Sequence, residues 1–319
     1  MKRAPRVLVA AGMVLAGVTG GGASALAATG SNAPGWCNPG SSVAATAVPA
    51  RFAASSCNTT AMAITDGPAS VFVPARGLTV SAAVLTTTGT RLLTVAHSAD
   101  GQVSVQRGLP APAAPAAPAA SGCTSSAYSD LGYQVGGSYA WKYNGKGAPA
   151  NVAGSALANL KTATSNMASG RDDCGIAGKP RTGQSFTGTT AANPGITTDA
   201  RCAPNPDQVN ITGWKALSAS GVLAVTCTYS FTGSGDVADS DAAINTKFKW
   251  VTSSAGCNNA YDLQGVMTHE RGHTYGLGHV SGSGDQGLTM YPSVRACDFS
   301  IRTLGKGDLL GMFHIYGKA

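Results

Sequence analysis

The chain has 319 residues and a formal net charge of +7, but only 12% of its residues are charged. Its lysines and arginines are scattered, and no stripe of basic and aromatic residues occurs. This composition argues against a nucleic-acid-binding protein, because such proteins gather basic residues on one face or along one helix.

The first residues have the layout of a secretory signal peptide. A positively charged start at residues 2–6 precedes an apolar stretch at residues 7–18 and a small-x-small cleavage site at residues 25–27. The apolar stretch is shorter than the ~20 residues that span a bilayer, which disfavours a membrane anchor. We therefore predict that residues 1–27 are removed and that the mature protein is secreted, extracellular and free of a membrane anchor.

Residues 28–108 are predicted to form a β-rich N-terminal region. Apolar runs at residues 71–73, 78–85 and 92–95 are typical of strands, and Gly, Pro and Thr separate them. The region carries no recognisable site, and with about 80 residues it could fold alone only marginally. It could be a pro-region, an accessory domain or a cell-wall-binding domain, and we favour a pro-region slightly.

A Pro/Ala linker is predicted at residues 109–121. Residues 110–120 read PAPAAPAAPAA, and proline at every third position favours an extended chain without a core. Loose linkers of this kind concentrate proteolytic nicking. The linker separates the N-terminal region from residues 122–319, which are numerous enough for a domain with its own core.

This C-terminal domain is predicted to be α+β, because strands come first and helices later. Residues 171–209 are rich in Gly, Thr, Pro and Asp and look like a long loop region. Asn258 or Asn259 is expected near the N-cap of the second helix, and Asp308 is expected to cap the third. The expected strands are residues 138–143, 222–230 and 243–250, and the expected helices are residues 151–167, 261–275 and 309–316.

Eight cysteines in an exported chain indicate disulfides. A zinc–thiolate site is a poor alternative, because no C-x-x-C pair occurs. The sequence does not fix the connectivity. The pairs expected from closeness along the chain are Cys37–Cys57 and Cys174–Cys202, and Cys257 could pair with Cys297.

One segment of eleven residues, HERGHTYGLGH, concentrates the chemistry. His269 and His273 lie four residues apart, so one helical face presents both imidazoles to one ion. Glu270 lies beside the first histidine, where its carboxylate can reach a water without binding the metal. Gly276 allows the chain to leave the helix, so that His279 can return to the same ion. Three neutral imidazoles leave one tetrahedral position open, which is the catalytic arrangement for zinc.

Histidines on a helix are more often packing or surface residues than metal ligands. Here three of the five histidines and the only glutamate of the chain fall within this one segment. We therefore predict one catalytic zinc held by His269, His273 and His279, with Glu270 as the general base.

The pattern H-E-x-x-H-x-x-G-x-x-H followed by a methionine resembles that of the metzincin zinc proteases. Met290 matches the methionine turn, which in that family lies beneath the metal, and Pro292 makes the turn similar to that of the matrixin branch. The resemblance implies a twisted, mostly parallel sheet with a long active-site helix, a C-terminal helix and a sheet edge that binds the substrate strand. It also implies a substrate pocket (S1′) walled by Pro292, Ser293 and Val294.

The chain also departs from the matrixin pattern. It lacks the PRCGxPD cysteine switch, so the usual mechanism of latency is not expected. His97 and His314 are the only histidines outside the motif, too few for a second, structural zinc. Asp236, Asp239 and Asp241 could hold calcium, although aspartates in a Gly/Ser loop are more often only solvated.

The sequence thus predicts a secreted zinc-dependent endopeptidase, a hydrolase that acts on protein or peptide substrates. The alternative is a secreted zinc-binding or adhesion module without catalysis. Glu270 argues against that alternative, because a site that only binds metal has no need of this carboxylate. No oligomeric state is predicted.

Overall fold

The computed structural model describes residues 34–108 and 122–319. The predicted signal peptide and the predicted linker at residues 109–121 therefore lie outside the described residues. The helices are α1 (Ala150–Ser169), α2 (Leu263–Thr274) and α3 (Lys306–Tyr316), with short 3-10 turns at Ala54–Ser56 and Ser300–Arg302. The strands are β1 (Ser42–Ala44), β2 (Arg51–Ala53), β3 (Ala63–Asp66), β4 (Ala69–Phe72), β5 (Leu78–Thr86), β6 (Gly89–His97), β7 (Gln102–Arg107), β8 (Ser129–Asp130), β9 (Ser138–Asn144), β10 (Gly183–Thr189), β11 (Ile211–Lys215), β12 (Val222–Phe231), β13 (Val237–Asn245), β14 (Trp250–Val251), β15 (Tyr261–Asp262) and β16 (Leu277–Gly278).

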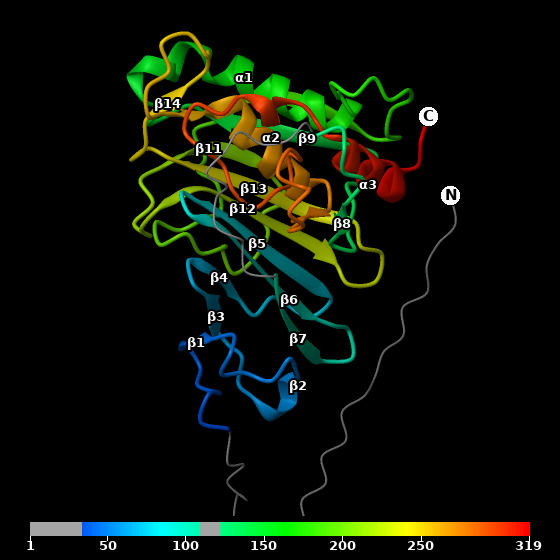
Figure 1. Ribbon diagram of the computed structural model, residues 1–319. Coiled ribbons are helices and arrows are strands. Elements are labelled where there is room, and N and C mark those ends of the chain that lie inside the picture. The colour runs from blue at the N-terminus through cyan, green and yellow to red at the C-terminus, as the bar shows by residue number, and fades with distance from the viewer. Residues whose placement is uncertain (1–33, 109–121) are drawn as a thin grey trace, which may run out of the picture. The chain divides into compact units, whose positions relative to one another are not determined.

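A sheet of nine strands, in the order β10-β9-β11-β13-β12-β5-β6-β7-β2, dominates the described fold (Figure 1). The first four strands in this order pair in parallel. All later pairings are antiparallel. Residues 122–319 supply the five strands from β10 to β12, and residues 34–108 supply the other four. The two regions predicted on either side of the linker therefore share one sheet and join where β12 meets β5.

The two faces of this sheet bury separate apolar cores. The first core contains α1, α2 and one face of β9, β11, β13 and β12. The second core contains the opposite face of β12 and apolar residues of β3, β4, β5 and β6. Because both faces are covered, β12 (VLAVTCTYSF) is buried along nearly its whole length. A strand covered on both sides needs no polar alternation, which accounts for its near-continuous run of small and apolar residues.

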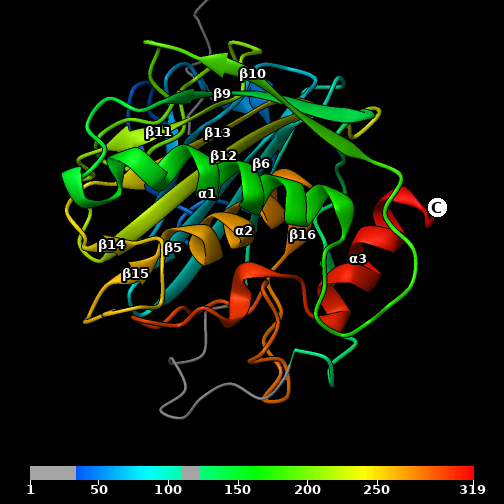
Figure 2. The same cartoon turned by 90° about the horizontal axis from the view of Figure 1, so that it is seen from above.

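Helices α1 and α2 lie side by side over the sheet, as Figure 2 shows from above. Helix α1 ends at Gly170, which adopts a left-handed conformation with φ 66°. Arg271 of α2 is fully buried and fixes this layer. Its guanidinium donates to the hydroxyls of Thr164 on α1 and Thr212 on β11.

The caps of the last two helices differ from the prediction. The N-cap of α2 is Asp262 rather than Asn258 or Asn259, because its carboxylate accepts the Gly265 N–H at 2.8 Å. Helix α3 begins after Gly305, and Asp308 lies inside its first turn. The Asp308 carboxylate nevertheless accepts the Gly305 N–H at 2.8 Å. A side chain inside the first turn therefore satisfies the backbone donor of the N-cap residue.

Of the five strands that residues 122–319 supply to the nine-stranded sheet, two were missed and one was misplaced by the sequence patterns. β10 lies within the predicted loop at residues 171–209, and β11 follows it directly. β10 (GQSFTGT) is an edge strand with little apolar alternation, so its pattern resembles a loop. The strand predicted at residues 243–250 instead runs over Val237–Asn245. Its aspartates disfavour a strand by propensity, but their carboxylates bind loop N–H groups in the folded chain.

All eight cysteines form disulfides in the structure. The predicted pairs Cys37–Cys57 and Cys257–Cys297 are confirmed. The predicted pair Cys174–Cys202 is wrong, because the fold places Cys202 beside β12, where it bonds Cys227. Cys174 bonds Cys123 instead. Separation along the chain does not report separation in space, and only the sheet brings these partners together.

Candidate metal centre

Helix α2 and the turn that follows it carry the three histidines. His269 and His273 are one helical turn apart on α2, and both are buried. Gly276 then reverses the chain with φ +91°, and a Cβ at this position would lie 2.2 Å from the carbonyl oxygen of Tyr133. Only glycine fits this turn without strain. Strand β16 follows at once, pairs with β8 and brings His279 back toward the helix.

The three imidazoles converge through the same ring atom. His269 Nε2 lies 3.2 Å from His273 Nε2 and 3.2 Å from His279 Nε2. Within the described ranges 34–108 and 122–319, these three residues form the one group of His, Cys, Asp or Glu whose ligand atoms all lie within 4.8 Å.

The opposite ring nitrogen, Nδ1, has an oxygen partner in each histidine. The partners are the Thr289 carbonyl at 2.7 Å for His269 and the Leu277 carbonyl at 2.9 Å for His273. For His279 the partner is the Thr90 hydroxyl at 3.3 Å. A carbonyl oxygen can only accept, so Nδ1 of His269 and of His273 carries the proton. Partners of this kind fix the tautomer and the orientation of metal-ligating histidines.

This arrangement fits a cation. With the proton on Nδ1, the Nε2 atoms of neutral His269 and His273 present lone pairs to each other at 3.2 Å and cannot form a hydrogen bond. Burial lowers the pKa of His269 to about 4, so the neutral form is favoured. Burial also lowers the pKa of His273 and His279 well below the ordinary value. Three neutral imidazoles with converging lone pairs are the donor set that zinc prefers.

Glu270 lies beside this group, buried within α2. Its Oε2 accepts a hydrogen bond from the hydroxyl of Thr226 on β12 at 2.5 Å. Its Oε1 is buried and has no hydrogen-bond partner among the described residues. Burial raises the pKa of this carboxyl to about 8, and a cation held by the neighbouring histidines would favour its ionised form. One oxygen is therefore anchored, and the other remains available for proton transfer.

Met290 lies against α2 between the two helical histidines. A Cβ added to Gly272 would lie 2.1 Å from the Met290 sulfur, so the helix has room for this thioether only because residue 272 is glycine. The turn is fixed by Asp308, whose carboxylate accepts the N–H groups of Thr289 at 2.7 Å and Met290 at 3.1 Å. Met290 therefore packs on the helix that carries His269 and His273.

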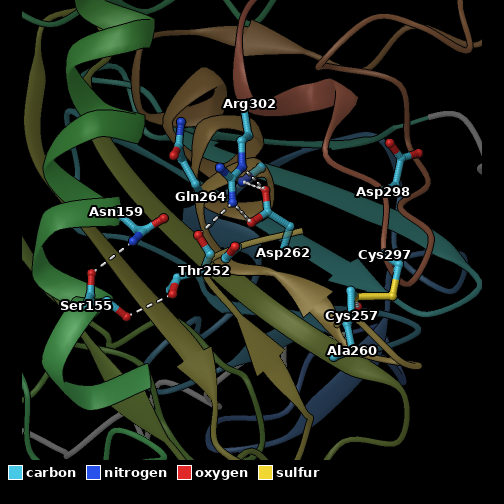
Figure 3. A network of polar contacts seen from close by, with 12 residues as sticks. Ser155, Asn159, Thr252, Cys257, Ala260, Asp262, Gln264, Cys297, Asp298 and Arg302 are labelled. Atoms are coloured by element: carbon cyan, nitrogen blue, oxygen red, sulfur yellow. Dashed lines mark hydrogen bonds and ion pairs between the residues drawn. A yellow bond between two sulfur atoms is a disulfide. The ribbon is translucent and has the colours of Figure 1, made fainter. Parts of the chain in front are cut away.

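The chain beyond the methionine turn is tied to the start of α2, as Figure 3 shows. Arg302 donates to both carboxylate oxygens of Asp262, at 2.8 and 2.6 Å, in the bidentate geometry that gives strong pairs. The disulfide Cys257–Cys297 closes the same loop from the other side. These links hold residues 291–302 in a fixed position relative to the metal centre.

A cavity of about 310 Å³ opens beside His279. Pro292 of the predicted pocket wall lines it, whereas Val294 is buried in the apolar core around α1 and α2 and Ser293 does not line it. The remaining lining comes from both sequence regions, with Leu92, Thr94, Gln106, Arg107 and Gly108 from the N-terminal one and Ser129, Asp130, Leu131 and Ser281 from the other. The assignment of these residues to a substrate pocket stays a prediction.

The predicted calcium site gains no support. Asp239 and Asp241 are buried. Asp239 accepts the Asp207 N–H of the loop before β11, and Asp241 accepts the N–H of Ile211, the first residue of β11. Asp236 lies apart from them, where it pairs as an isolated bridge with Gln134. In the described residues these aspartates do not bring three ligand atoms as close together as the histidines do.

Sequence reasoning missed the partners that orient the site. Thr90 and Thr226 are threonines on strands, a residue type too common in this chain to mark a position. The Thr289 and Leu277 oxygens belong to the backbone and carry no signal in the sequence at all.

For the described residues, no helix is both long and apolar enough to cross a membrane.

Comparison with known families agrees with this geometry. Residues 217–317 match the family model described as Matrixin. The match spans β12, β13, α2, the methionine turn and α3, and it supports a matrixin-like zinc metalloprotease domain in this part of the chain. No protein with a curated function matches the chain.

Proposed function

We propose that this matrixin-like domain is a secreted zinc-dependent endopeptidase in which His269, His273 and His279 hold the metal. The observation that carries the proposal is the convergence of the three Nε2 atoms while every Nδ1 has an oxygen partner. The four disulfides are consistent with export to an oxidising compartment.

Glu270 is the proposed general base. Zinc at this site would acidify a water and polarise the scissile carbonyl. Thr226 holds one carboxylate oxygen, so the free oxygen accepts the proton of the attacking water. The same oxygen returns that proton to the leaving amine, and the peptide bond is replaced by a carboxyl group and an amino group. The Thr289 and Leu277 carbonyls keep the imidazoles of His269 and His273 in place while the proton moves.

The proposal is tested with the purified secreted protein and a library of fluorogenic peptides. Zinc is measured by elemental analysis, and hydrolysis is measured before and after limited proteolysis of the protein. We expect one zinc per chain, hydrolysis that a chelator abolishes, and recovery when zinc is restored. His273→Ala should remove stoichiometric zinc. Unchanged zinc in that variant would contradict the ligand assignment, and a folded, zinc-loaded, proteolysed protein without activity would favour a binding module.

A further inference from the structure

Strand β12 lies beside the proposed metal centre. Its Thr226 hydroxyl bonds Glu270, and α2 packs directly against the strand. Among the five strands supplied by residues 122–319, β12 is the outermost on this side. Without residues 34–108, its second edge would offer a row of unpaired N–H and C=O groups beside the metal. An edge of this kind is where an extended peptide adds as a further strand.

In the structure that edge is occupied by β5. The two strands run antiparallel and pair at nine positions, from Leu78 opposite Phe231 to Thr86 opposite Val222. A peptide that adds to β12 would need the same backbone groups. A docked peptide and β5 therefore exclude each other.

The hairpin of β5 and β6 also covers the proposed metal centre. Thr90 at the start of β6 contacts His279, and Leu92 and Thr94 line the cavity beside it. His269 and Glu270 are completely buried, and His273 is only 1% exposed. β5 itself pairs on both edges, with β12 on one side and β6 on the other. Its carbonyls are committed to the sheet, so β5 covers the centre without being presented for hydrolysis.

No disulfide ties this cover to the rest of the chain. Cys37–Cys57 lies within residues 34–108, and the other three disulfides lie within residues 122–319. No cysteine of the described residues is free. A cut between residues 108 and 122 would therefore leave the two regions held together by non-covalent contacts alone.

From these observations we infer that β5 holds the place of an extended peptide substrate on β12, so that residues 34–108 inhibit the site until they leave it. The inference rests on the proposed endopeptidase function and adds its regulation. Peptides that bind after release would lie antiparallel to β12, in the register that β5 now occupies. The tether explains why inhibition would persist in the intact chain, because a linked segment acts at a millimolar effective concentration.

The experiment uses the full secreted chain with a specific protease recognition sequence inserted between residues 109 and 121. A second version also carries Leu78→Cys and Phe231→Cys, which face each other across β5 and β12. Cross-strand positions lie within the Cα separation that a disulfide requires. Both versions are loaded with zinc, cut, diluted to about 1 µM and assayed on a fluorogenic peptide. The control is the cut chain with Leu78→Cys alone, treated with the same mild reductant.

Dilution after cutting lowers the effective concentration of the inhibiting region by roughly 10³-fold relative to the tethered chain. We expect hydrolysis to rise by at least roughly 100-fold on cutting and dilution, with release of the N-terminal region seen by gel filtration. The doubly substituted chain should stay at the uncut rate until the reductant opens its disulfide. The control should be active with and without reductant.

Three results would overturn the inference and leave the proposed function standing. The uncut, zinc-loaded chain could already hydrolyse the peptide at the full rate. The cut chain could be active while the N-terminal region stays bound, or the disulfide-locked chain could be active. If the released form instead unfolded or lost its zinc, β5 would be a structural strand of the domain. That result would also contradict the inference. A released, folded, zinc-loaded form that cleaves no peptide would refute the proposed function itself.

Discussion

The two parts of the nine-stranded sheet differ in what they bury. In residues 34–108 the buried polar side chains are Ser70, Ser81, Thr90 and His97, and none is a carboxylate, lysine or arginine. In residues 122–319, six carboxylates, Arg271 and two histidines are buried. The buried carboxylates are Asp239, Asp241, Asp262, Glu270, Asp285 and Asp308.

Burying a charge costs free energy unless hydrogen bonds or ions compensate it. The part of the sheet that accepts this cost is the part that holds the proposed chemistry. The other part buries mainly apolar side chains and small hydroxyls, and its contribution is a set of strands that fill an edge. Under the proposed function, one region supplies the reactive groups and the other covers them.

The largest expected effect comes from Glu270→Gln in the form released from residues 34–108. The substitution keeps the shape of the side chain and removes its ability to accept a proton at neutral pH. General acid–base catalysis is worth about 10²–10⁴-fold, and one residue serves two proton transfers here, so kcat should fall by the upper end of that range or more. KM, zinc content and thermal melting should change little. A variant that retains most of its kcat with zinc bound would contradict the assignment.

Asp308→Ala should destabilise the protein strongly. Three backbone N–H groups, of Thr289, Met290 and Gly305, lose their acceptor inside the protein. Unsatisfied buried donors cost about 1–3 kcal/mol each, so we expect a loss of roughly 3 kcal/mol or more in denaturant unfolding. The control is Asp100→Ala in the N-terminal region, whose exposed carboxylate bonds only its own turn and whose loss should barely shift the Tm. Equal Tm shifts in the two variants would contradict this contrast.

Thr90→Val tests whether residues 34–108 contribute to metal binding. The hydroxyl of Thr90 is the partner of His279 Nδ1, and losing such partners typically weakens metal binding by about 10–100-fold. We expect zinc affinity in the intact chain to fall by about tenfold, measured by competition with a chelator. Thr94→Val, on the same strand and bonded to Ser81 instead, should have no such effect. An identical loss in both variants would reduce the role of Thr90 to packing.

The last expected effect is a pH dependence of stability that resides in β13. Burial, reinforced by the neighbouring Asp239, raises the pKa of Asp241 to about 8. The unfolded pKa is about 3.9, so the folded state binds a proton that the unfolded state has lost. This contribution is fully present below about pH 4 and disappears as the pH rises through about 8. Between pH 5 and 9 the wild-type Tm should fall further than that of Asp241→Asn, which has no titrating group at this position. Parallel curves would remove Asp241 as the cause.

Residue patterns along the sequence predicted much of the described fold. The runs that became β5, β9 and β12, and the helices α1, α2 and α3, were placed within a few residues, because each has a clear apolar period or a glycine stop. β10 and β11 were missed, the first because this edge strand has little apolar alternation. Most of β13 was missed because Asp239 and Asp241 read as loop residues until the loop N–H groups that they bind are in place.

By itself the sequence determined the chemistry of the site: the identity and spacing of His269, Glu270, His273 and His279, the glycine that turns the chain, and the methionine that follows. Spacing within one helix and one turn is a local property, so a linear pattern can carry it. Only the tertiary structure decided that Thr226 anchors Glu270, that Cys202 bonds Cys227, and that β5 lies on the edge of β12. These contacts join residues that are 25 to about 150 positions apart in the chain. The packing of the sheet selects them from many threonines, cysteines and strands that are equal in local pattern.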